Sequence, residues 1–145
     1  MKLTEYVERA WGWTGIRPVE VVGENDFGNL IVRDVGGLYW RITPEDLDCE
    51  VVAHDRAELD AMSRDQGFLR DWYMSALVED ARGRFGPLAP GRKYCLKIPG
   101  VLGGEYGGDN LASISLVELI EASGHLAQQT KSLPAGTQVQ LRIVE

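Results

Sequence analysis

The fold is decided by the stretch Leu30–Trp40, which reads LIVRDVGGLYW. Two runs of aliphatic and aromatic residues, Leu30–Val32 and Leu38–Trp40, flank the turn-forming residues Asp34–Gly37. Two such runs joined by a short segment rich in Gly and Asp are typical of a β-hairpin. We therefore predict two antiparallel strands here.

Apolar or alternating runs on both sides of the hairpin predict the other strands: Val19–Val22, Cys49–Ala53, Lys93–Ile98, Leu111–Ile114 and a closing strand with Val139, Leu141 and Ile143. Thr43–Asp46 has the hydroxyl, proline and carboxylates of a helix start, and we expect only a short turn there. Because short connections dominate the first half, the pattern favours an α+β fold over a doubly wound sheet. We predict a single domain over residues 1–145, with a mainly antiparallel sheet packed by two or three helices.

Helical spacing of apolar residues predicts the helices, at Leu3–Trp11, after Asp55, at Gly67–Arg84, and after a capping box at Ser115–Glu118. The third has the clearest pattern, and its stripe should be buried: Phe68, Leu69, Trp72, Tyr73, Ala76, Leu77 and Ala81. We expect the last helix to break or bend near Gly124. Trp13, just beyond the first helix, could be an exposed anchor or could fasten that helix to the core.

The charge is acidic: 22 Asp and Glu residues against 15 Lys and Arg give a formal net charge of -7. Phosphate backbones and anionic membranes repel such a chain, whereas basic proteins attract it, so we expect neither a nucleic acid nor a membrane as a direct partner. The two cysteines, Cys49 and Cys95, have no metal-ligand spacing, and isolated thiols favour a reducing compartment. With no signal-peptide pattern at the N-terminus, we expect a cytoplasmic protein.

Residues that could carry catalysis are few. His54 beside Asp55 could form a base with its orienting group, but a strand-to-helix junction capped by Asp55 explains the pair more simply. His125 is read as a solvated helix residue. No nucleophile motif, paired-Cys motif or phosphate-binding lysine is present, so we predict no enzymatic activity, no cofactor and no metal.

Three segments carry a resemblance to a known family: Gly37–Leu47; Phe68–Leu77 with its Asp71–Trp72 pair; and Lys93–Tyr106 followed by Asp109 and Asn110. In this order they resemble the C-terminal domain of the Tdi-type immunity proteins of bacterial type VI secretion systems. The resemblance runs from about Phe27 to the C-terminus and leaves residues 1–26 outside it. It implies a cytoplasmic protein that binds a cognate toxic effector of nuclease type and blocks it, with no catalytic residues to carry over.

The Gly-rich segment 100–110 is the candidate binding site. Its glycines permit unusual backbone angles, and Glu105, Tyr106, Asp109 and Asn110 provide charge, an aromatic ring and an amide. These residues could contact a basic effector, or Glu105 and Asn110 could fasten the loop to the sheet. The alternative function is a regulatory or small-ligand-binding domain in which this loop forms one wall of a pocket.

Overall fold

The computed structural model describes residues 1–133, so the closing strand predicted around Val139, Leu141 and Ile143 lies outside the described residues. The strands are β1 (Pro18–Glu24), β2 (Leu30–Asp34), β3 (Tyr39–Thr43), β4 (Asp48–Ala53), β5 (Arg92–Leu96) and β6 (Leu111–Ser115). The α-helices are α1 (Leu3–Trp11), α2 (Arg56–Met62), α3 (Gln66–Tyr73), α4 (Ser75–Phe85) and α5 (Leu116–Thr130). Short 3-10 helices are η1 (Gly12–Thr14), η2 (Pro44–Asp46), η3 (Gly100–Leu102) and η4 (Gly108–Asn110).

The sheet is an antiparallel meander of four strands in the order β1-β2-β3-β4, and β5 and β6 form a separate antiparallel pair. The predicted hairpin joins β2 to β3. Its turn is fixed by Asp34, whose carboxylate accepts hydrogen bonds from the backbone N–H groups of Gly36 and Leu38 and from the indole of Trp40, each at 2.9 Å. Gly37 takes the left-handed conformation there, with a φ of 85°. The predicted α+β class and antiparallel pairing are confirmed.

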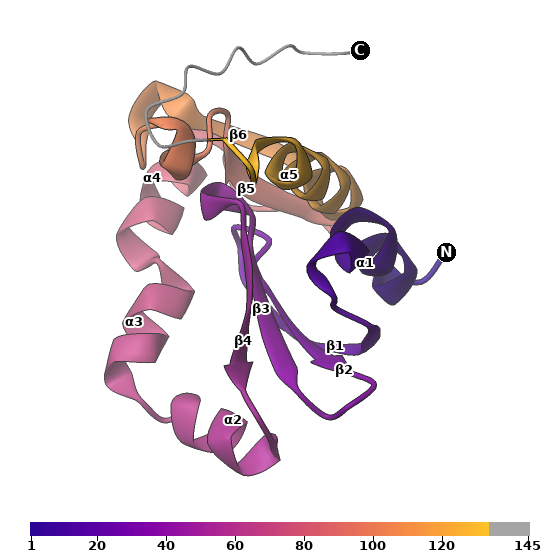
Figure 1. Ribbon diagram of the computed structural model, residues 1–145. Helices are drawn as coiled ribbons and strands as arrows, with labels where there is room; N and C mark the ends of the chain where they lie inside the picture. Colours follow the sequence, from indigo (N-terminus) through magenta and orange to yellow (C-terminus); the bar gives the residue numbers. More distant parts are fainter. Residues whose placement is uncertain (134–145) are drawn as a thin grey trace.

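Helices α1 and α5 lie side by side over one face of the meander (Figure 1). The cluster between them and the sheet holds Val7, Trp11, Ile16, Leu30, Val32, Ile42, Leu116, Ile120 and Ala127. Trp13 fastens α1 here, because its indole N–H lies 3.0 Å from the carbonyl of Ala10 and 3.3 Å from that of Gly124. The bend expected near Gly124 is wrong: α5 continues through it, and the missing side chain lets the two helices approach closely.

The opposite face of the meander is covered by α2 and α3, which are joined to α4 along one side of the molecule (Figure 1). The single helix predicted over Gly67–Arg84 is wrong, because Met74 adopts the left-handed conformation and separates α3 from α4. The carbonyl of Trp72, which would accept from residue 76 in a continuous helix, instead accepts from the side chain of Asn25 at 2.8 Å.

The stripe predicted as one buried face is therefore divided between two helices. Ala81 is fully buried beside Tyr94 and Leu111, whereas α3 contributes no fully buried residue. Tyr73 and Ala76 are exposed, and Trp72 is half-buried against the cluster of Ile31, Tyr39 and Ala53. Among the described helices, none combines the length and the apolar character needed to cross a membrane.

Candidate functional site

The loop between β5 and β6 is held in one shape by the side chain of Asn110. Its amide donates to the carbonyl oxygens of Ile98 at 2.9 Å and Glu105 at 2.7 Å, and its oxygen accepts from the N–H of Ile98 at 2.9 Å. Gly104 lies against the same carbonyl, since a Cβ at that position would stand 1.8 Å from the oxygen of Ile98. Asn110 thus closes the neck of the loop.

Tyr106 is the aromatic side chain that this loop presents. It is 56% exposed, but its hydroxyl donates a hydrogen bond to the carboxylate of Asp46 on η2. That hydrogen bond, together with desolvation and the nearby carboxylates, raises the pKa of Tyr106 to about 12. Val101 of the same loop is also exposed. The hydroxyl of Tyr106 is therefore held in position while more than half of the residue remains exposed.

The other end of the loop is tied to α4. The N–H of Gly108 donates to the carboxylate of Asp80 at 3.1 Å, and Arg84 joins Asp80 at 2.9 Å to Asp109 at 3.5 Å. The hydrogen bond from the N–H of Gly108, together with the one from Arg84, lowers the pKa of Asp80. Of the predicted site residues, Glu105, Tyr106 and Asp109 are exposed on one loop, and Asn110 lies inside it.

Beneath this surface lies a buried polar network that the sequence patterns do not reveal. Asn29, which is fully buried, donates to the carboxylate of Glu45 at 2.7 Å and accepts from Arg41 at 3.1 and 2.8 Å. The guanidinium of Arg41 also lies over the rings of Phe68 and Trp72 on α3. From the sequence, Glu45 was expected only to be one of the carboxylates at the start of a helix in Thr43–Asp46. In the structure, its hydrogen bond from Asn29 connects η2 to the core.

Burial raises the pKa of Glu45 from 4.5 to about 7, with the hydrogen bond from Asn29 opposing the rise. Between these values the folded protein binds a proton that the unfolded chain does not, so stability should fall by about 3 kcal/mol as the pH rises from 4.5 to above 7. Glu45→Gln should remove this dependence. Urea denaturation of both proteins at pH 5 and pH 8 measures it, and parallel pH profiles would contradict the assignment to Glu45.

The candidate catalytic residues show no catalytic arrangement. Asp55 caps α2 by accepting from the N–H of Glu58 at 2.8 Å, as the simpler interpretation predicts. His54 lies on the surface, 3.0 Å from the carboxylate of Glu58, and His125 is exposed on α5. Within residues 1–133, no three His, Cys, Asp or Glu side chains gather as metal ligands.

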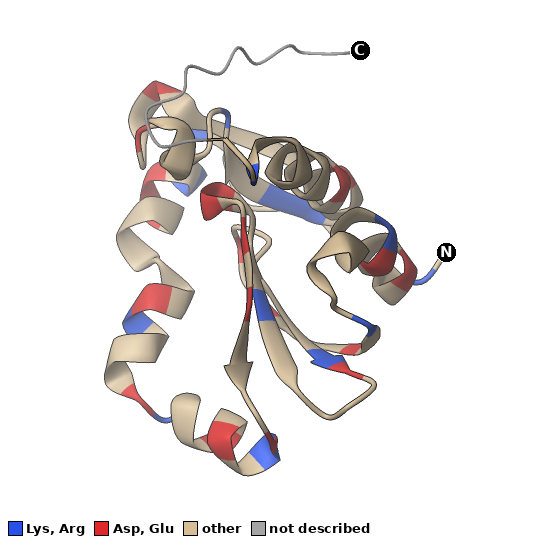
Figure 2. Cartoon of the chain, viewed as in Figure 1, with Lys and Arg blue, Asp and Glu red and all other residues tan. Residues whose placement is uncertain are grey.

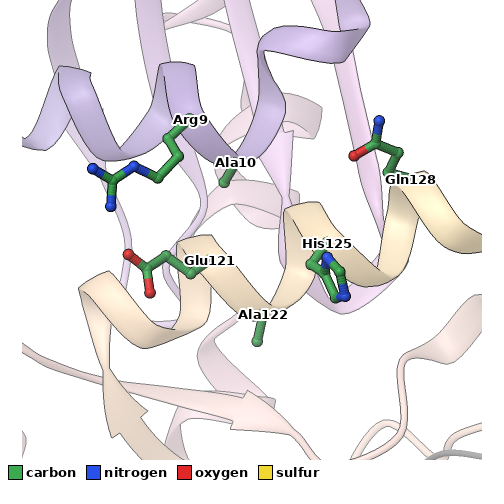
Figure 3. Close-up of a pocket in the computed structure, with 6 residues that line it drawn as sticks. All are labelled: Arg9, Ala10, Glu121, Ala122, His125 and Gln128. Carbon is green, nitrogen blue, oxygen red and sulfur yellow. The ribbon is translucent and has the colours of Figure 1, made fainter.

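Three hollows between described residues are open rather than deep. The largest, of about 450 Å³, lies between α1 and α5, where Arg9 and Glu121 project from facing helices beside His125 (Figure 3). Every charged residue that lines it is exposed. Residues 100–110 line none of the three hollows, although Lys97 and Pro99, at the start of the same loop between β5 and β6, line the third.

Comparison of the sequence with known protein families identifies the family of this chain. Residues 53–127 match the family model described as "T6SS immunity protein Tdi1, C-terminal". The match contains the second and third of the resembling segments and begins after the first, Gly37–Leu47. No curated protein matches the chain. Since the matched range covers more than half of the sequence, this chain belongs to the family of the Tdi1-type immunity proteins, as a relative of their C-terminal domain.

Proposed function

We propose that this protein is a non-enzymatic immunity protein that binds and neutralises a cognate secreted effector in the cytoplasm of the cell that makes it. Membership in a family of type VI secretion immunity proteins is the observation that carries the proposal. The loop between β5 and β6 supports it, because it presents an exposed ring and carboxylates on a segment already fixed by hydrogen bonds. A preorganised loop loses little conformational entropy on binding.

The effector is proposed to be basic and of nuclease type. A net charge of -7 and the exposed carboxylates of Glu105 and Asp109 favour a positively charged partner, and a protein that grips nucleic acid carries such a surface. In this arrangement Tyr106 is the contact that holds the complex together, and Asn110 contributes by positioning the loop. The protein itself contacts neither nucleic acid nor membrane.

Charge reversal tests the loop. Glu105→Lys with Asp109→Lys should slow association with the catalytically inactivated effector about tenfold, because attraction between opposite charges accelerates encounter. Tyr106→Ala should weaken binding about tenfold, mainly through faster dissociation. Kinetic binding measurements at low and high salt, together with thermal melts, separate these effects from unfolding.

The matched control is Glu5→Lys with Glu8→Lys on α1, which makes the same change in net charge at exposed sites on another element. It should reduce the association rate less than the loop variant does. Survival of cells that express the active effector provides the functional measurement. Equal protection by the folded loop variants and the wild type would place the interface elsewhere, and no protection by the wild type would refute the immunity role.

A further inference from the structure

The loop between β5 and β6 exposes three large apolar side chains close together in the sequence. Ile98, Val101 and Tyr106 are 44%, 64% and 56% exposed. Single exposed apolar residues are common on protein surfaces, but a group of them marks a contact with a protein, a membrane or a ligand. Between positions 1 and 133, no other stretch as short as 98–106 exposes three large apolar side chains. These three residues, the apolar loop surface, are therefore a candidate contact with another molecule.

Contacts within the loop hold these side chains at the surface. The phenol of Tyr106 lies where a Cβ of Gly100 would stand, so its ring is next to the backbone that carries Val101. Asn110 holds the backbone of Ile98, because its amide donates to the carbonyl at 2.9 Å and its oxygen accepts from the N–H at 2.9 Å. The apolar loop surface therefore needs little rearrangement to bind a partner.

The apolar loop surface does not line a hollow. None of its three residues is among those that line the three hollows described above. Sites for small molecules are concave and bury most of the ligand, so side chains that stand outside such hollows suit a macromolecule instead. The partner must then provide the concave side of the contact.

The charges beside this surface distinguish between classes of macromolecule. Arg84 is paired with Asp80 and Asp109, whereas Lys97 is exposed and forms no ion pair with any described residue. The carboxylates on or next to the loop still outnumber these two cations: Asp46, Asp80, Glu105 and Asp109. Figure 2 shows acidic residues both on the loop and on η2. Nucleic acids and anionic membranes would be repelled, so these charges favour a protein as the partner.

We propose that Ile98, Val101 and Tyr106 form the apolar centre of the contact with the effector and insert into an apolar hollow of the effector. The proposal rests on the immunity function proposed above and adds the kind of surface that the effector presents. A second copy of this chain is a poorer partner, because two chains with a net charge of -7 repel each other. The carboxylates around the loop then govern the rate of encounter, and the apolar centre governs the lifetime of the complex.

The substitution Val101→Asp tests the apolar centre, because charge and apolar contact predict opposite results. An added carboxylate would increase the attraction to a basic effector, so contact through charge alone predicts equal or tighter binding. Insertion into an apolar hollow predicts binding weakened by about thirtyfold, chiefly through faster dissociation, because the carboxylate would lose its water. This loss should persist at high salt, where attraction between exposed charges is screened. Binding kinetics with the catalytically inactivated cognate effector measure both quantities.

Val35→Asp is the matched control, because Val35 is a 69% exposed valine in the turn between β2 and β3. It adds the same charge away from the loop and should change affinity less than about twofold. Ile98→Asp is a second variant within the apolar loop surface and should weaken binding as Val101→Asp does. Thermal melts of each variant separate lost binding from lost folding.

The possible outcomes separate the two proposals. Wild-type or tighter binding by the folded Val101→Asp and Ile98→Asp variants would overturn the apolar centre and leave the immunity function intact. Equal weakening by Val35→Asp would overturn the assignment to this loop. If Val101→Asp abolished self-association of the chain and left effector binding unchanged, the partner would be a second copy and the proposal would be wrong. Failure of the wild-type chain to bind the effector would refute the proposed function itself, and this inference with it.

Discussion

Gly124→Ala should lower the free energy of unfolding by about 2 kcal/mol, although alanine is the better helix former. A Cβ at this position would stand 2.4 Å from the carbonyl oxygen of Ala10 and 2.8 Å from its Cβ. Those atoms belong largely to the backbone of α1, so the whole helix must move. Its displacement also loosens the hydrogen bonds of the Trp13 indole to Ala10 and Gly124.

Gly83→Ala on α4 is the matched control, because nothing lies within 4 Å of a Cβ built there. It should stabilise the protein by about 0.5–1 kcal/mol through helix propensity alone. Urea denaturation of both variants measures their free energies of unfolding, which should change in opposite directions from that of the wild type. If Gly124→Ala proved as stable as the wild type, the close approach of α1 to α5 would be wrong.

Local signals in the sequence were sufficient for the hairpin and for most element positions. Asp34 and Gly37 provide a side-chain acceptor and a left-handed angle within the turn itself, so neighbouring residues determine the result. The cap of α2 at Asp55 was predicted for the same reason. In these cases the physical cause lies within a few residues of its effect, which is the range that sequence patterns can report.

Contacts between distant segments explain the errors. The break at Met74 has no glycine or proline to mark it, and Asn25, far away along the chain, binds the carbonyl of Trp72 there. Glycine is often found where a helix breaks, but at Gly124 it is needed because the backbone of Ala10 on α1 lies too close for a side chain. A periodic pattern records which residues are apolar, and it does not record which segment they will meet.

The candidate site was only partly predictable for the same reason. Composition and resemblance identified the loop and its residues Glu105, Tyr106, Asp109 and Asn110. They did not identify Asp46, which holds the hydroxyl of Tyr106, because the two are 60 positions apart. One of the three hollows, beside α3, was also missed, since the stripe that lines it was interpreted as a buried helix face.

Asn29→Ala should be the most destabilising of the proposed substitutions, lowering the free energy of unfolding by about 3 kcal/mol. The change removes the donor to Glu45 and the acceptor for Arg41 together, and leaves both groups inside the protein without Asn29 as partner. Arg41 and Glu45 connect α3 and η2 to the sheet, so effector binding through Tyr106, whose hydroxyl is held by Asp46 on η2, should weaken as well. Urea denaturation and effector binding measure the two effects.

Moving the carboxyl group from residue 45 to residue 29 tests the hydrogen bond between the two side chains. Asn29→Asp keeps an acceptor for Arg41 but places a second carboxyl against Glu45, so its cost should be larger at pH 8 than at pH 5. Adding Glu45→Gln to Asn29→Asp restores this hydrogen bond with the roles reversed, because the glutamine amide can donate to the new carboxylate. The double variant should recover most of the lost stability at pH 8. Without that recovery, the Asn29–Glu45 hydrogen bond would not be the link between η2 and the core. With it, the arrangement of donors and acceptors would be shown to matter more than the identity of either residue.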